Sequence, residues 1–136
     1  SGDGAFGIAV TELTAIGREE WPAITQIVFR NYQWGAEKRN STLWYDDNFV
    51  GTELDTQVSY AGIARACGLQ GVVAHTMEEL TAALAKAVED QMKHGKTTLI
   101  EAMINQELGE PFRRDAMKKP VEIAGIIAAD MRHQKV

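Results

Sequence analysis

Apolar residues recur along most of the chain at the spacings of helices and strands. Phe6, Val10 and Leu13 are three or four positions apart, which predicts a helix over residues 5–18. The segment that follows, residues 24–31 (ITQIVFRN), is β-branched and mostly apolar, as in a buried strand. The chain therefore begins with a helix followed by a strand.

The second half of the chain continues this alternation. We expect further elements at residues 56–67 (helix), 71–75 (strand), 76–93 (helix) and 97–104 (strand). Thr76 and Glu79 form the capping box that starts a helix, and we expect Leu80, Leu84 and Val88 to face the core. Strands that alternate with helices predict an α/β fold, a parallel sheet flanked by helices on both faces.

Two segments lack such a pattern. Residues 32–54 show no clean period but are rich in Tyr, Trp and Phe, so we expect a long loop that folds over something. The tail is expected to form an extended arm followed by a helix over residues 121–131. We therefore divide the chain into an α/β domain, residues 1–104, and a C-terminal arm and helix, residues 105–136.

Charge and composition exclude several classes of protein. The chain has 136 residues and a net charge of −5, and its 14 Lys and Arg are scattered, which argues against nucleic acid as a partner. Its single cysteine, Cys67, fits a reducing compartment. No apolar run approaches the ~18 residues of a membrane span. We therefore expect a cytoplasmic protein that does not bind membranes.

The first residues carry a phosphate-binding pattern with an unexpected acid. Residues 2–7 (GDGAFG) match G-x-G-x-x-G, yet Asp3 would repel a diphosphate by ~4 kcal/mol at about 4 Å and an effective dielectric near 20. Such loops normally follow a strand, which is missing here, so we expect an α/β fold that is incomplete at its N-terminus and belongs to a longer protein.

A metal ion would resolve the conflict of charges. Asn31 ends the strand at residues 24–31, and the carboxyl ends of parallel strands are where ligands bind. Asp3 and Asn31 would offer oxygen ligands to Mg²⁺, which could bridge to a diphosphate held by the amides of Gly4 and Ala5. The alternative for Asp3 is a simple helix N-cap. A dinucleotide site is disfavoured, because no acidic residue ends the second strand.

The spacing of GDG and Asn31 resembles the motif of the thiamine diphosphate-dependent decarboxylase and acetolactate synthase superfamily. The resemblance implies that Asp3, Asn31 and the main-chain carbonyl of Gln33 bind Mg²⁺. The full set that it implies for cofactor binding is Gly2, Asp3, Gly4, Ala5, Phe6, Asn31, Gln33 and Trp34. The chain departs from the pattern at Arg30, where many members have a first asparagine.

Longer stretches are similar to one acetyltransferase of this superfamily. They are VFRNYQWGAEKRN, WYDDNFVGTELD and NQELGEPFRRDAMKKP. The similarity implies conversion of sulfoacetaldehyde and phosphate into acetyl phosphate and sulfite, as part of taurine metabolism. It also implies a homo-oligomer and N-terminal domains that carry the glutamate needed to activate the cofactor. The chain alone would then anchor the cofactor without catalysing the reaction.

Three further residues are candidates for the chemistry. Glu37 lies where some members of the superfamily have an active-site glutamate, although surface exposure fits equally well. Arg113 and Arg114 could hold a sulfonate or phosphate, or be solvated or salt-bridged. Three other readings of the whole chain stay open: another thiamine diphosphate enzyme, a non-catalytic phosphate- or nucleotide-binding module, and a structural remnant.

Overall fold

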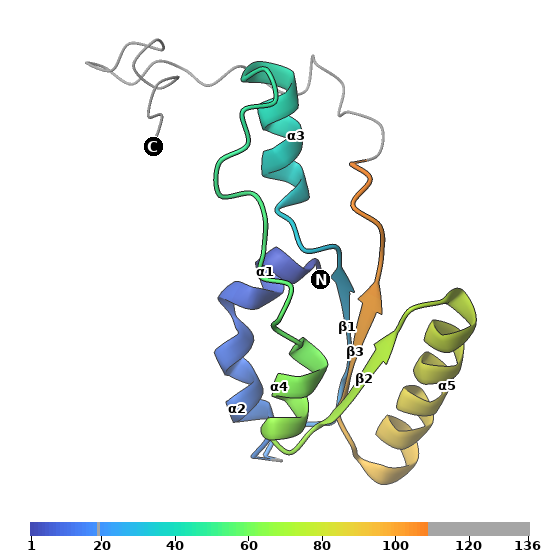
Figure 1. Ribbon diagram of the computed structural model, residues 1–136. Helices are drawn as coiled ribbons and strands as arrows, with labels where there is room; N and C mark the ends of the chain where they lie inside the picture. Colours follow the sequence, from blue (N-terminus) through green and yellow to red (C-terminus); the bar gives the residue numbers. More distant parts are fainter. Residues whose placement is uncertain (19, 109–136) are drawn as a thin grey trace. The chain divides into compact units, whose positions relative to one another are not determined.

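The computed structural model describes residues 1–18 and 20–108 (Figure 1). The chain divides into two compact units. The first contains Ser1–Gln33 and Glu53–Gln106, and the second contains Trp34–Thr52 and the segment that starts at Glu107.

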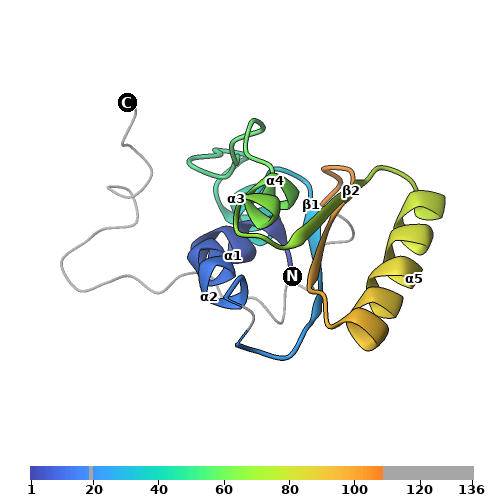
Figure 2. The same cartoon turned by 90° about the horizontal axis from the view of Figure 1, so that it is seen from below.

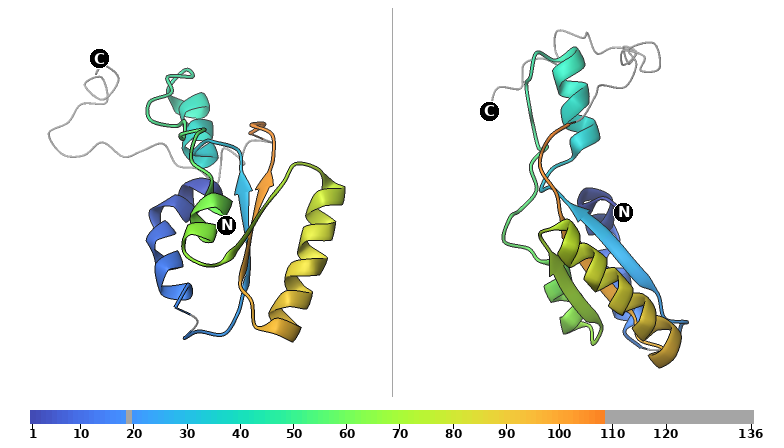
Figure 3. Two further views of the ribbon diagram at one scale, coloured as in Figure 1. Left: turned by 60° about the horizontal axis from the view of Figure 1, so that its bottom comes forward. Right: turned by 90° about the vertical axis from the view of Figure 1, so that its right-hand side faces the viewer.

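Three parallel strands form the sheet of the first unit (Figure 3). They are β1 (Thr25–Arg30), β2 (Gln70–Ala74) and β3 (Thr98–Met103), in the order β1-β3-β2. In this register Thr98 is the partner of both Thr25 and Gln70. The three predicted strands are confirmed to within one residue at each end.

Helices cover both faces of this sheet, as the alternation of elements predicted (Figure 2). On one face lie α1 (Asp3–Ile8), the 3₁₀ helix η1 (Val10–Glu12), α2 (Leu13–Ile16) and α4 (Tyr60–Ala66). On the other lies α5 (Met77–His94). The core follows the pleat of the strands, because Val28 and Leu99 pack with Tyr60 on the first face, while Ile100 packs with Ala87 on the second.

Two predicted helices differ from those observed. The helix expected over residues 5–18 starts at Asp3 and is broken at Ala9, where φ is −107° and ψ is 14°. Glycines early in this stretch lower its helix propensity. The helix expected over residues 56–67 starts only at Tyr60, because Ser59 is the N-cap and accepts a hydrogen bond from the Gly62 amide.

The capping box of α5 is confirmed, and its predicted core stripe is confirmed at Leu80 but wrong at Leu84 and Val88. Thr76 Oγ1 accepts from the Glu79 amide, and the Glu79 carboxylate accepts from the His75 amide. Of the predicted stripe, Leu80 packs on the sheet with Ala83 and Ala87, whereas Leu84 and Val88 are 37 % and 45 % exposed. Small alanines allow α5 to approach the sheet closely, and the larger residues lie on the neighbouring side of the helix.

The second unit contains a helix that the sequence did not predict. Within the segment expected to be a loop, Gly35–Trp44 form α3, none of whose residues is buried. Its sequence has no apolar stripe, so its period could not be recognised. The Trp34 amide donates to the Thr52 carbonyl at 2.7 Å, and Lys38 Nζ lies 5.2 Å from the centre of the Phe49 ring.

Part of the sequence prediction lies outside the described residues. This applies to the helix expected over residues 121–131, to most of the arm, and to Arg113 and Arg114. The domain boundary after residue 104 stays a prediction. Among the residues that the structure describes, no helix is both long and apolar enough to cross a membrane.

Close packing of α4 on β2 depends on Gly71. A Cβ atom at Gly71 would lie 2.1 Å from the carbonyl oxygen of Ala61, which belongs to the backbone of α4 and cannot move aside. We therefore expect Gly71→Ala to lower the free energy of unfolding by about 1–3 kcal/mol, measured by chemical denaturation of the whole protein.

Gly62→Ala provides the matched control. A Cβ there would meet its nearest atom at 3.4 Å, an ordinary contact, inside α4. Because alanine favours the helix, this variant should be neutral or more stable by up to about 1 kcal/mol. Equal stability of the two variants would contradict this account of the packing.

Candidate metal centre

The start of the chain lies beside the end of β1. Gly2 pairs with Phe29 in an isolated parallel bridge, and the Phe29 amide donates to the Ser1 carbonyl at 2.8 Å. Asp3 is thereby placed next to Asn31, as the sequence predicted from the ends of two neighbouring strands.

The carboxylate of Asp3 links these two segments directly. Asp3 is 2 % exposed, and its Oδ2 accepts hydrogen bonds from the Asn31 amide at 3.1 Å and from the Tyr32 amide at 2.7 Å. Its Oδ1 accepts from the Gly4 amide at 2.9 Å. The N-cap of α1 is Gly2, so the structure rejects the alternative that Asp3 is merely a helix cap.

Asn31 and Gln33 are held by Gln106, a residue that the sequence analysis missed. The Gln106 side chain donates to the Asn31 carbonyl at 3.0 Å, and the Gln33 side chain donates to the Gln106 carbonyl at 2.8 Å. The Asn31 Oδ1 accepts from the Gln33 amide at 3.3 Å. Gln106 follows β3, the strand next to β1, and only this pairing of strands could have identified it.

Tyr32 adopts an unusual backbone conformation between these two residues. Its φ is 61°, a left-handed value that a bulky residue rarely adopts. Its amide donates to Asp3, and its carbonyl accepts from the Leu54 amide at 2.8 Å. These two hydrogen bonds hold the turn at residues 31–33, which carries both predicted ligands that follow β1.

A buried arginine balances the charge of Asp3. Arg30 is 1 % exposed, and its Nη1 lies 3.6 Å from Asp3 Oδ2. Its Nε lies 3.3 Å from Glu101 Oε1 but makes no hydrogen bond of good geometry. Two buried carboxylates thus share one cation. This cluster has only a weak signal in the sequence, because Arg30 and Glu101 each interrupt an otherwise mostly apolar strand.

The guanidinium of Arg30 also contacts the loop before α4. Its Nη2 donates to the carbonyls of Asp55 and Val58 at 2.7 and 2.8 Å. The guanidinium carbon lies 4.4 Å from the centre of the Tyr32 ring and 4.7 Å from that of Tyr60. Such distances allow cation–π attraction to both rings.

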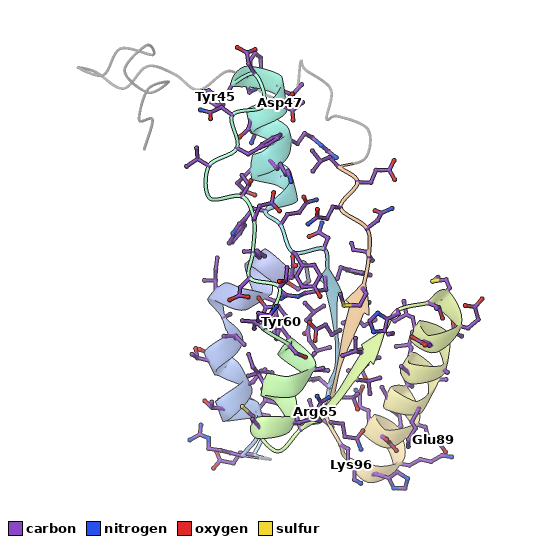
Figure 4. All side chains as sticks on the ribbon, in the orientation of Figure 1. Tyr45, Asp47, Tyr60, Arg65, Glu89 and Lys96 are labelled. Carbon is purple, nitrogen blue, oxygen red and sulfur yellow. The ribbon has the colours of Figure 1, made fainter. Side chains whose placement is uncertain are left out.

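Tyr60 and Glu101 connect α4 to the same site. The Tyr60 hydroxyl, at the start of α4 (Figure 4), donates to the Asp3 carbonyl at 3.0 Å. Burial raises the pKa of Tyr60 above its ordinary value, opposed by the Arg30 guanidinium, so the phenol stays a neutral donor at neutral pH. Glu101 Oε2 accepts from the Ser59 hydroxyl and the Ala61 amide.

The remaining residues predicted for the site lie on α1 and at the start of α3. Phe6 packs edge-on against Tyr60, with ring centres 5.1 Å apart, and its amide donates to the Gly2 carbonyl. Ala5 lies in the first turn of α1, whose amides lack helical acceptors. Trp34 and Glu37 belong to the second unit, as the N-cap and a first-turn residue of α3, and Glu37 is exposed. Their roles stay predictions.

The donors at this site suit a hard cation. Within residues 1–18 and 20–108, no three His, Cys, Asp or Glu side chains are grouped as a metal site would require. Asp3 and Asn31 instead offer a carboxylate and an amide oxygen, the type of ligand that Mg²⁺ prefers. Asp3 Oδ1 accepts one hydrogen bond where Oδ2 accepts two, so its remaining lone pair is suited to a cation.

Comparison with known proteins identifies the family. Residues 1–102 match the family described as "Thiamine pyrophosphate enzyme, C-terminal TPP binding domain". The chain belongs to this family. The resemblance noted from GDG and Asn31 is therefore confirmed, and thiamine pyrophosphate (thiamine diphosphate) is the cofactor of the domain family.

Curated relatives are similar to the whole chain. Over 136 residues the chain is 82 % identical to a sulfoacetaldehyde acetyltransferase of Roseovarius nubinhibens, covering 100 % of the chain and 22 % of that protein. It is 83 % identical over 134 residues to the enzyme of the same name from Rhodobacter capsulatus, covering 98 % of the chain and again 22 % of that protein. The chain thus spans about a fifth of the length of these relatives.

A solved structure supports the fold. The crystal structure of benzoylformate decarboxylase from Polynucleobacter necessarius has a TM-score of 0.71 and 24 % sequence identity, covering 82 % of this chain and 20 % of that one. At this identity the likeness shows the α/β fold alone.

Asp3 should stabilise this domain even without metal. Asp3→Asn replaces an oxygen that accepts two backbone amides and removes the charge beside Arg30. We expect a loss of about 1–3 kcal/mol in the free energy of unfolding, measured in EDTA on the whole protein.

The control is Asp47→Asn, at an exposed position of the second unit (Figure 4). It should change stability by less than about 0.5 kcal/mol. If Asp3→Asn in EDTA behaved like this control, Asp3 would have no role in holding the turn.

Proposed function

We propose that this chain is the cofactor-anchoring C-terminal part of a sulfoacetaldehyde acetyltransferase, which converts sulfoacetaldehyde and phosphate into acetyl phosphate and sulfite. The observation that carries the proposal is the identity of 82 % over the whole chain to a protein of that name. Because the chain spans 22 % of that relative, the activity is proposed for a larger protein that contains these residues.

In this proposal Asp3, Asn31 and Gln33 bind Mg²⁺ through a carboxylate oxygen, a side-chain amide oxygen and a main-chain carbonyl. The hydrogen bonds from the amides of Asn31 and Tyr32 to Asp3 Oδ2 support it, because they orient Oδ1 for a cation. A cation at this point removes the conflict between Asp3 and a diphosphate, since it attracts both anions.

The amides at the start of α1 would complete the diphosphate site. Ala5 is the best-suited donor, because the Gly4 amide donates to Asp3 and the Phe6 amide to the Gly2 carbonyl. Gly2 leaves room for a ligand, since a Cβ there would meet nothing within 4 Å. Trp34 is proposed to line the cofactor site, Glu37 to act near the cofactor, and Arg113 with Arg114 to bind the substrate anion.

When bound, thiamine diphosphate supplies the nucleophilic carbon and the electron sink for acyl transfer. This chain's residues fix the diphosphate end of the cofactor and, through the buried turn at residues 31–33, keep the metal ligands in place. The remaining parts of the enzyme are proposed to supply the activating glutamate. We further propose a homo-oligomer in the cytoplasm that acts in taurine metabolism.

Removal of either side-chain metal ligand should strongly weaken anchoring of the cofactor. In the whole protein, we expect Asp3→Ala and Asn31→Ala to weaken Mg²⁺-dependent binding of thiamine diphosphate by at least about 100-fold, measured by calorimetry. Formation of acetyl phosphate from sulfoacetaldehyde and phosphate should fall in parallel.

Asp90→Asn is the matched control, because Asp90 is also a buried carboxylate but pairs with Lys86 on α5. It should bind the cofactor as the wild type does. Cofactor binding that survives EDTA and Asp3→Ala would refute the metal site. A wild-type protein that binds cofactor with Mg²⁺ but converts pyruvate and not sulfoacetaldehyde would refute the substrate and leave the anchoring role intact.

A further inference from the structure

Arg30 contacts nearly every segment that shapes the proposed metal site. It directly precedes Asn31, and its buried guanidinium touches Asp3, the Tyr32 ring and the loop before α4. We propose that Arg30 is a positioning residue that sets the geometry of the metal ligands and thereby the preference of the site for a small cation. This inference rests on the proposed metal site and goes beyond it.

The guanidinium fixes the turn that carries two of the ligands. Its Nη2 donates to the carbonyls of Asp55 and Val58, in the loop before α4. Anchored in this way, the planar guanidinium stacks near the Tyr32 ring, at 4.4 Å. Because Tyr32 has a φ of 61°, its conformation persists only where neighbours hold it. Arg30 is one of those neighbours, and Asn31 and Gln33 flank Tyr32.

The guanidinium also makes the two carboxylate oxygens of Asp3 inequivalent. Its Nη1 lies on the side of Oδ2, the oxygen that already accepts two backbone amides. Oδ1, which accepts the Gly4 amide, is the oxygen left for a cation. Arg30 and the turn at residues 31–33 therefore fix the orientation of the Asp3 carboxylate toward the metal.

Glu101 in turn holds the side chain of Arg30 in place. Glu101 Oε1 lies 3.3 Å from Nε, while Oε2 accepts from the Ser59 hydroxyl and the Ala61 amide. Lysine at position 30 would keep the charge but could not span Asp55, Val58, Glu101 and Asp3 with a planar fork of donors. A lysine variant therefore separates geometry from charge.

Cation selectivity distinguishes positioning from a general loss of structure. Mg²⁺ requires nearly ideal octahedral geometry at 2.0–2.1 Å, whereas Ca²⁺ accepts irregular coordination at 2.3–2.6 Å. Loosening the turn should therefore weaken Mg²⁺ binding more than Ca²⁺ binding. General destabilisation would weaken both alike.

The experiment compares Arg30→Lys with Arg65→Lys in the whole protein at saturating thiamine diphosphate. Arg65 is an exposed arginine whose Nη1 also donates to a backbone carbonyl, that of Gly71, so it is a matched control. Dissociation constants for Mg²⁺ and Ca²⁺ are measured by calorimetry. We expect the preference for Mg²⁺ over Ca²⁺ to fall by about tenfold in Arg30→Lys and to be unchanged in Arg65→Lys.

A folded Arg30→Lys protein with the wild-type ratio of the two constants would overturn the inference. If Arg30→Lys does not fold, Glu101→Gln tests the inference instead, because it keeps the guanidinium but removes the charge facing Nε. The same ratio should then fall by a smaller factor, and an unchanged ratio would again overturn the inference. A wild type that binds the cofactor without any divalent cation would overturn the proposed metal site itself, a result distinct from both.

Discussion

The carboxylate of Asp3 joins the first helix to the end of β1, across a sequence separation of 28 residues between Asp3 and Asn31. Most features of the site follow from this link. It requires a charge in a buried place, and that charge requires Arg30, whose guanidinium must in turn be held by Glu101 and by backbone carbonyls. The strained turn at Tyr32 exists because its amide donates to the same carboxylate.

The buried charges of Asp3, Arg30 and Glu101 add little to the stability of the fold, because desolvation of buried ions offsets much of their attraction. Its value lies in geometry. Backbone amides, two aromatic rings and a planar guanidinium define one arrangement of the turn, and a functional site gains from ligands that are already in position. Small residues also contribute to this geometry. Gly71 and Ala61 allow α4 to lie close to the sheet, and Ala87 does the same for α5.

The fold could be predicted from sequence where local patterns carry the information. The three strands are short apolar runs, and the capping box at Thr76 starts α5 as expected. The inward face of α5 was predicted only at Leu80, because the pattern indicates a stripe of large residues, whereas Ala83 and Ala87 pack on the sheet in place of Leu84 and Val88.

For the site, the sequence placed Asp3 beside Asn31, because parallel strands end at the same edge. It could not find the parts that depend on long-range contacts. Gln106 becomes relevant only when β3 pairs with β1, and the role of Arg30 depends on a loop that begins at Asp55. α3 was missed for another reason, because a helix with no buried face leaves no periodic signal.

We propose that Asp3, the carboxylate in the phosphate-binding pattern, holds a metal ion that also contacts the diphosphate. The most direct test is a crystal structure of the whole protein with thiamine diphosphate and Mn²⁺, with the metal located by anomalous scattering. We expect an anomalous peak within coordination distance of Asp3 Oδ1, Asn31 Oδ1, the Gln33 carbonyl and diphosphate oxygens. A bound diphosphate with no metal at this point, or a metal that leaves Asp3 uncoordinated, would contradict it.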